Sequence, residues 1–207
     1  MKSVGAAVML FNGAKKRRQD LHAAVIDIDV EKRDLQQCAD AVTRLRAEWL
    51  GSIGAKDRIA FNFTGGGRVA YSRFASGARP SEDGKRWRQK AKADQSYKGF
   101  RRYMTNVFVY AGTYSLAREL KAVPGGVTPQ IGDVIIKGGF PGHAVLVVDM
   151  AENASTGEKR FFWRKATCRH STFTFRRTWR RAMAAHGMTR RSHGLLRHRN
   201  GRSRRAA

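Results

Sequence analysis

The chain has 207 residues, with 41 Lys and Arg against 16 Asp and Glu, which gives a formal net charge of +25. This length suits one domain with an extension, and a hydrophobic fraction of 42% excludes a chain that is disordered throughout. Two cysteines without CxxC spacing exclude a disulfide scaffold and a typical zinc site, and no apolar run reaches the roughly 18 residues of a membrane span.

The first predicted elements are a strand and a long helix. Residues 22–30 alternate apolar and acidic side chains, which predicts a strand. Apolar residues then recur at steps of three and four, which predicts one face of a helix capped by Asp34, with Gln37 completing a capping box. The members of this apolar stripe are Leu35, Cys38, Val42, Leu45 and Trp49. A second strand is predicted over residues 59–64.

The second half of the body predicts a helical pair followed by a hairpin. Residues 65–95 are mixed and basic, and we expect them to be mostly loop. Ser96 is predicted to cap a helix that Gly112 ends, and Thr113 to cap a shorter helix. Strands over residues 131–137 and 143–150 are joined by the turn GGFPG, so we expect a hairpin and, for the whole body, an α+β fold.

The positive charge is concentrated in residues 163–207, which contain 13 Arg and one Lys but no Asp or Glu. Apolar residues there keep no sustained period, which predicts disorder. Three interpretations remain open at this point: a nucleic-acid-binding arm, a solvated tail without a role, and translation of the wrong reading frame of GC-rich DNA.

Several long blocks of the body, in this order, resemble one bacterial family. They are HAAVIDIDVEKRDLQQCADAVTRLRAEWL, IAFNFTGG, SYKGFRRYMTNVFVYAGTYSLARELK and IGDVIIKGGFPGHAVLVVDMAEN. They are similar to domain-of-unknown-function family 4846 over about residues 8–162. The resemblance implies a longer N-terminus with an export or lipoprotein signal, hence a cell-envelope or periplasmic location. Met1 would then lie inside the family's domain, and this chain carries no convincing signal sequence.

The same resemblance predicts a frameshift near Phe162. The family should continue with a strand close to Leu-Ala-Gln-Ser-Tyr-Met-Pro-Ala-Gln, and the codons of FWRKATCRHS allow that strand when they are read from the third base. We therefore predict a partial domain over residues 1–162 and a disordered, out-of-frame tail over residues 163–207. Residues 143–150 would then lie at an exposed sheet edge, and contacts of the tail with nucleic acid or other anions would be non-specific and salt-sensitive.

The segment GDVIIKGGFPGHAVLVVD resembles the hairpin of NlpC-type papain-like cysteine peptidases. The resemblance implies an incomplete NlpC-like sheet with packed helices and makes His143, which opens the second strand, a candidate general base. The alternative is that His143 merely ends the turn and bonds to backbone.

Two residues are candidates for the nucleophile that such a histidine would activate. Ser96 begins a helix 47 residues before His143, near the spacing that the resemblance implies, but a plain helix cap is the alternative. Cys38 lies in the first turn of its predicted helix, where the helix dipole favours a thiolate, but it also belongs to the apolar stripe and could be a core residue.

One further motif is a loop tryptophan among cations. Trp87 lies between Arg86 and Arg88, close to Lys90 and Lys92, and either stacks on a nucleobase or anchors a loop.

Three functional hypotheses follow. The first is a Cys–His or Ser–His hydrolase of cell-envelope peptides or amides, inactive in this chain because the polar group that should orient His143 is missing. The second is a non-catalytic binding domain of the same fold, and the third is nucleic-acid binding through the basic tail. We predict no cofactor and no metal.

Overall fold

The computed structural model describes residues 2–3, 5–20, 22, 24–124, 129–152, 155, 159–165, 174–176 and 194–198. The helices are α1 (Cys38–Ser52), the 3-10 helix η1 (Lys56–Arg58), α2 (Tyr71–Ala75), α3 (Tyr97–Tyr110) and α4 (Thr113–Glu119). The strands are β1 (Ala24–Val25), β2 (Ala60–Asn62), β3 (Arg68–Ala70), β4 (Ala78–Pro80), β5 (Trp87–Gln89), β6 (Leu120–Ala122), β7 (Val134–Lys137), β8 (His143–Glu152), β9 (Lys159–Lys165), β10 (Thr174–Arg176) and β11 (Gly194–His198).

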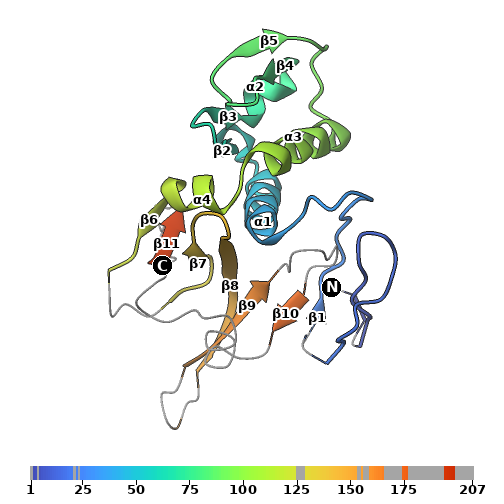
Figure 1. Cartoon of the computed structure of the whole chain (residues 1–207), viewed down its shortest axis with the longest axis vertical. Coiled ribbons are helices and arrows are strands. Elements are labelled where there is room, and N and C mark those ends of the chain that lie inside the picture. The colour runs from blue at the N-terminus through green and yellow to red at the C-terminus, as the bar shows by residue number, and fades with distance from the viewer. Residues whose placement is uncertain are drawn as a thin grey trace.

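The large sheet forms one end of the molecule, α2 and α3 with the two short hairpins form the other, and α1 and α4 lie between them (Figure 1). Seven strands form one antiparallel sheet in the order β1-β10-β9-β8-β7-β11-β6, with β8 at its centre. The pairs β2–β3 and β4–β5 form two separate hairpins beside α2 and α3. Helices and sheets are thus combined in an α+β fold, as the sequence predicts.

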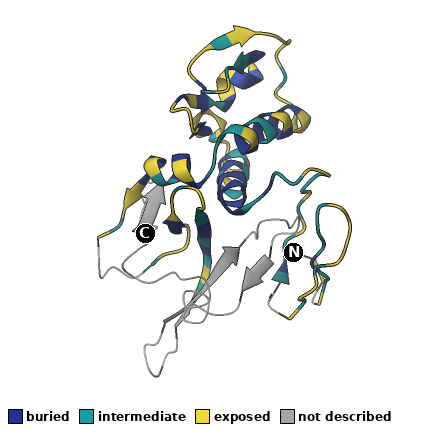
Figure 2. Cartoon of the chain, viewed as in Figure 1, coloured by how far each residue is buried: buried dark blue, intermediate teal, exposed yellow. Residues whose placement is uncertain are grey.

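Two hydrophobic clusters hold these parts together. The aromatic cluster consists of Ala47, Leu50, Ile59, Phe61, Phe63, Val69, Tyr71, Phe74, Ala75, Phe100, Tyr103, Met104, Val107 and Phe108. The aliphatic cluster consists of Ala39, Val42, Leu116, Leu120, Val134, Ile136 and Ala144. Helix α1 contributes its second half to the first and its first half to the second, so it is buried along most of its length (Figure 2).

The predictions for α3 and for the β7–β8 hairpin are confirmed. Ser96 is the N-cap residue of α3, and its hydroxyl accepts a hydrogen bond from the Gly99 N–H at 3.1 Å. The hairpin pairs Lys137 with His143. A strong helical period and the short turn GGFPG are signals that depend on neighbouring residues. The sequence alone is therefore enough to predict the helix and the hairpin.

Other boundaries were wrong. Helix α1 begins at Cys38 with Gln37 as N-cap, later than the Asp34 cap that the sequence predicts, because the preceding loop is held by side chains far along the chain. Residues 65–95 lie mostly outside helices and strands, as expected, but they also hold the short elements β3, α2, β4 and β5, which the sequence does not predict. Their strands have only three residues each, too few to show a period.

Strand β8 has neighbours on both sides. It pairs with β7 and, from Leu146 opposite Arg164 onward, with β9, so the exposed edge expected from the sequence was wrong. The end of β9 and the strands β10 and β11 fall within residues 163–207 and pair into the sheet. The rest of that segment lies outside the described residues, so its disorder and the domain boundary at residue 162 stay predictions.

Within the described part of the chain, none of the helices combines the length and the hydropathy that crossing a membrane requires.

Candidate functional site

A pocket of about 280 Å³ lies where the start of α1 meets the turn between β7 and β8. The start of α4 and the end of α3 close its other sides. Its lining consists of Asp34, Leu35, Gln37, Cys38, Ala39, Asp40, Phe108, Ala111, Gly112, Thr113, Gly139, Phe140 and Gly142. We call it the α1 pocket.

Cys38 is the first residue of α1 and lies in the wall of the α1 pocket. Only 6% of the residue is exposed, so a reagent or substrate would reach its Sγ through the pocket. The free N–H groups of a helix N-terminus and the helix dipole favour a negative charge at this place. The sequence predicts Cys38 within the first turn of the helix, and in the structure Cys38 is the first residue of α1.

Asp40 stands one half-turn further along α1 and also lines the pocket. Its Oδ2 accepts a hydrogen bond from the Gln37 N–H at 2.9 Å, which caps the helix. Burial nevertheless raises the pKa of Asp40 to about 7, because a desolvated carboxylate is costly. The sequence analysis missed this residue, since an acidic residue in a first helical turn is ordinarily a surface feature.

Two buried arginines fix the loop that leads into α1. Arg101 of α3 contacts Oε1 of Glu31 at 2.6 Å through its Nη2. Arg44, which is fully buried, donates from its Nε to Oε1 of Glu48 at 2.7 Å and from its Nη2 to the Tyr97 hydroxyl at 3.0 Å. The position of Cys38 therefore depends on residues of α3 as well as of α1.

The β7–β8 turn fits closely against the start of α4. The Thr113 hydroxyl donates a hydrogen bond to the carbonyl oxygen of Gly139 at 3.0 Å. Gly139 has a positive φ of +116°, and a Cβ at Gly142 would clash with the Thr113 side chain. These contacts explain the glycines of the GGFPG turn and hold the turn at the mouth of the pocket.

An aromatic pair stands beside this mouth. Phe140, at the tip of the turn, is 81% exposed, and its ring stacks against Tyr114 with centroids 6.2 Å apart. An exposed aromatic side chain at the rim of a pocket is typical of a ligand contact.

His143 directly follows the turn residue Gly142 and begins β8, where it is half-buried. Its neighbour Ala144 packs in the aliphatic cluster with Ala39, which is the neighbour of Cys38. This packing places the backbone of β8 beside the start of α1, but neighbouring residues of a strand point to opposite faces, and His143 is not among the residues that line the α1 pocket.

Ser96 lies in a different place. It lines a second pocket of about 240 Å³ with Glu48 and Tyr97, and neither Cys nor His is among the described residues of its lining. Its hydroxyl donates to Oδ1 of Asp94 at 2.6 Å and accepts from Gly99, so both of its ordinary roles are occupied by cap contacts. The pKa of Asp94 is lowered, mainly by the hydrogen bond from Ser96.

The described residues contain no cluster of three or more His, Cys, Asp or Glu side chains able to hold a metal ion. Cys168 and the tail residues His170, His186 and His193 lie outside the described residues.

Comparison with curated proteins found no match, and comparison with solved structures found none either. Comparison with protein families matched residues 1–167 to the family described as domain of unknown function 4846. The match ends close to Phe162, and the change of reading frame expected there stays a prediction. The match covers most of the chain, which therefore belongs to family 4846 of the domains of unknown function.

Proposed function

We propose that the α1 pocket is the site of a Cys–His hydrolase of peptides or amides, with Cys38 as nucleophile and His143 as general base. One observation carries this proposal: the pocket that Cys38 lines is also lined by Gly139, Phe140 and Gly142 of the turn that leads directly into His143, although His143 itself is not among the lining residues. The resemblance of the hairpin to NlpC-type peptidases agrees with these roles, and cell-envelope peptides are the substrate class that it suggests.

The bond-making and bond-breaking steps involve the two side chains and water, with a third group needed to orient His143. A ring nitrogen of His143 takes the proton of the Cys38 thiol, and the thiolate adds to the substrate carbonyl carbon. The imidazolium returns the proton to the leaving amine as the C–N bond breaks, which leaves a thioester on Cys38. Water, deprotonated by His143, then attacks the thioester, and the carboxylic acid and free thiol are released.

The group that orients His143 in such enzymes is expected on the strand after β8. In the frame that the family resemblance predicts, a Gln stands there, and this chain lacks it. We therefore expect Cys38 to be activated by His143 while amide hydrolysis by this chain stays below detection. Sequencing the coding DNA around Phe162 tests the frame: one inserted or deleted base would restore the family's strand, and an intact gene in relatives would contradict it.

Alkylation of Cys38 tests the pair directly. The full chain is treated with iodoacetamide from pH 5 to 9, and modification at Cys38 is followed by peptide mass spectrometry. We expect His143→Ala to lower the rate at pH 7 roughly tenfold, because the base that favours the thiolate is removed. Cys168, followed in the same digests, is the internal control.

Equal rates in the two proteins would overturn the proposal, as would a Cys38 that is alkylated only on unfolding. His22→Ala is the matched variant, since the His22 ring lies 3.1 Å from the carbonyl oxygen of Ala6, away from the pocket lining. It should leave the alkylation of Cys38 unchanged.

Binding without hydrolysis is the second candidate function of the same pocket. The exposed Phe140–Tyr114 pair favours it, because such a rim can hold a ligand without any nucleophile. A ligand that protects Cys38 from alkylation equally in the parent and in His143→Ala would support this function in place of the hydrolase.

A further inference from the structure

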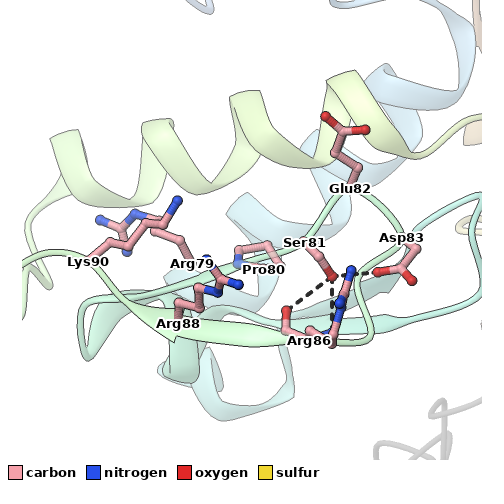
Figure 3. A pocket seen from close by; sticks show the side chains of 8 residues that line it. All are labelled: Arg79, Pro80, Ser81, Glu82, Asp83, Arg86, Arg88 and Lys90. Atoms are coloured by element: carbon pink, nitrogen blue, oxygen red, sulfur yellow. Dashed lines mark hydrogen bonds between the residues drawn. The ribbon is translucent and has the colours of Figure 1, made fainter.

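A third pocket, of about 450 Å³, opens on the β4–β5 hairpin, away from the α1 pocket (Figure 3). Its lining is dominated by cations and consists of Arg79, Pro80, Ser81, Glu82, Asp83, Arg86, Arg88 and Lys90. We call it the hairpin pocket. No step of the proposed hydrolysis uses it.

Strand alternation places the cations together. Arg86, Arg88 and Lys90 alternate with Trp87 and Gln89, so they share one face of the chain at intervals of about 7 Å. Arg79 of β4 lies opposite Arg88 in the register. Figure 3 shows Arg79, Arg88 and Lys90 gathered at one end of the pocket.

The acidic residues of the lining offset this charge only in part: the pKa of Asp83 is lowered mainly by the hydrogen bond from Ser81 and further by Lys85 and Arg86. Among the described residues, none of Arg86, Arg88 and Lys90 has a carboxylate within ion-pair distance. Oδ1 of Asp83 is engaged by the Ser81 hydroxyl and by the Lys85 N–H, and Glu82 lies apart from the three gathered cations in Figure 3.

Arg79 is held in place before any ligand arrives. Its Nη1 donates to the carbonyl oxygens of Phe74 at 2.9 Å and Ala78 at 2.8 Å, and its guanidinium lies 3.9 Å from the centre of the Phe74 ring. Burial, and to a smaller degree Arg102, lowers the pKa of Arg79, while Asp94 acts in the opposite direction.

The hairpin itself is a rigid platform. Trp87 packs against the aromatic cluster and lies under Arg73, whose guanidinium is 4.7 Å from the ring centre. A Cβ at Gly67 would clash with the backbone of Gly84, so the hairpin tip fits closely against the β2–β3 turn. Because one face of Trp87 is covered, stacking on a nucleobase is the less favoured use of this motif.

We propose that the hairpin pocket binds a small ligand carrying two or more phosphate groups. Three guanidinium groups and one ammonium supply several forked donors, and phosphate oxygens match that geometry. The spacing along β5 suits separate phosphates better than one. The volume accommodates an oligophosphate and leaves room for the organic part of a larger molecule.

Calorimetric titration of the full chain with inorganic tripolyphosphate tests this assignment. The variant combines Arg88→Glu with Lys90→Glu, both exposed, so its fold should be kept, as a circular dichroism spectrum would verify. The matched control combines Lys32→Glu with Arg33→Glu, which changes the net charge equally at exposed positions elsewhere. We expect the dissociation constant to rise about tenfold in the hairpin variant and less than twofold in the control.

Equal losses in both variants would overturn the proposal, because the tail's charge would then explain the binding. Citrate that binds as tightly as tripolyphosphate would overturn the choice of phosphate. A single-stranded oligonucleotide that binds more tightly, with the same dependence on Arg88 and Lys90, would replace a small ligand by nucleic acid. Loss of binding in the hairpin variant with normal Cys38 alkylation would separate this site from the α1 pocket.

Discussion

The two hydrophobic clusters differ in size and in what they support. The aromatic cluster packs α1, α2 and α3 with the β2–β3 hairpin, and it contains most of the large buried side chains. The aliphatic cluster is smaller, joins α1 and α4 to the central strands, and lies beside the α1 pocket. Stability thus depends mainly on one cluster and the candidate site on the other, with α1 linking them.

Tyr103→Ala should give the largest loss of stability. Tyr103 is fully buried, contacts the rings of Tyr71 and Phe74, and its hydroxyl donates to the carbonyl oxygen of Val69 at 2.9 Å. Removing this ring leaves a cavity and an unpaired carbonyl, at a cost of about 4 kcal/mol in the free energy of unfolding. Urea denaturation followed by circular dichroism measures it.

Tyr103→Phe is the matched variant for that experiment. It keeps the ring contacts and loses only the hydrogen bond, so about 1 kcal/mol should be lost. A Tyr103→Ala protein as stable as Tyr103→Phe would mean that the aromatic cluster is not the main source of stability.

Arg44→Leu tests the polar link between the clusters. Arg44 is fully buried in α1 and donates hydrogen bonds to the partly exposed Glu48, the exposed Tyr97 and the buried Gln36, so its removal leaves the Gln36 side chain without this partner. We expect a loss of about 3 kcal/mol in the free energy of unfolding.

The same variant should loosen the start of α1, because Arg44 also lies 3.4 Å from Oε1 of Gln36. Alkylation of Cys38 should then become faster and less dependent on His143. The exposed cation Lys98 of α3 supplies the control, and Lys98→Leu should change neither quantity. An Arg44→Leu protein with unchanged Cys38 reactivity would show that α1 alone holds the thiol in place.

The sequence predicted the parts of the fold that local patterns determine. The apolar stripe of α3, its Ser96 cap and the glycine-rich β7–β8 turn are readable because each depends on neighbouring residues. The start of α1 could not be predicted in this way, because Arg101 holds the preceding loop through Glu31, and these two residues are 70 positions apart in the sequence. The hairpin β4–β5 was missed because three-residue strands have no measurable period.

The sequence predicted the individual residues of the candidate site, but not which of them lie together in the fold. Cys38, Ser96 and His143 were each found from their residue type and position, yet spacing along the chain favoured Ser96 as the partner of His143. The structure distinguishes the two by their pockets, because Cys38 shares a pocket with the β7–β8 turn and Ser96 does not. Asp40 and Phe140 were missed because their importance comes from burial and exposure, which a single sequence does not give.

The raised pKa of Asp40, which lines the α1 pocket, predicts that the free energy of unfolding depends on pH. Its pKa is raised to about 7 in the folded chain, against an ordinary value of 3.8, so the folded state binds the proton more tightly. The free energy of unfolding should therefore increase as the pH falls through 7. This increase should be nearly complete at a pH close to 3.8, the ordinary pKa of the carboxyl. By linkage the change between pH 7 and pH 5 is about 2 kcal/mol.

Asp40→Asn isolates this contribution. The amide stays neutral and can still accept from the Gln37 N–H, so the difference in unfolding free energy between variant and parent should shrink by about 2 kcal/mol from pH 7 to pH 5. Thermal unfolding in both buffers measures it. A difference that does not vary with pH would mean that the Asp40 carboxylate is solvated when folded, and that the α1 pocket is more open than the packing around it indicates.

Ser96→Ala should have the smallest effect and separates a cap from a nucleophile. The variant loses the hydrogen bond from the Gly99 N–H, which should cost about 1 kcal/mol in the free energy of unfolding. It also loses the hydrogen bond to Asp94, so the pKa of that carboxyl should rise toward its ordinary value. Because Ser96 caps a helix of the aromatic cluster, the pH profile of Cys38 alkylation should be unchanged. If the profile moved with Ser96→Ala, the two clusters would be coupled, and the division between a stabilising cluster and a site-bearing one would fail.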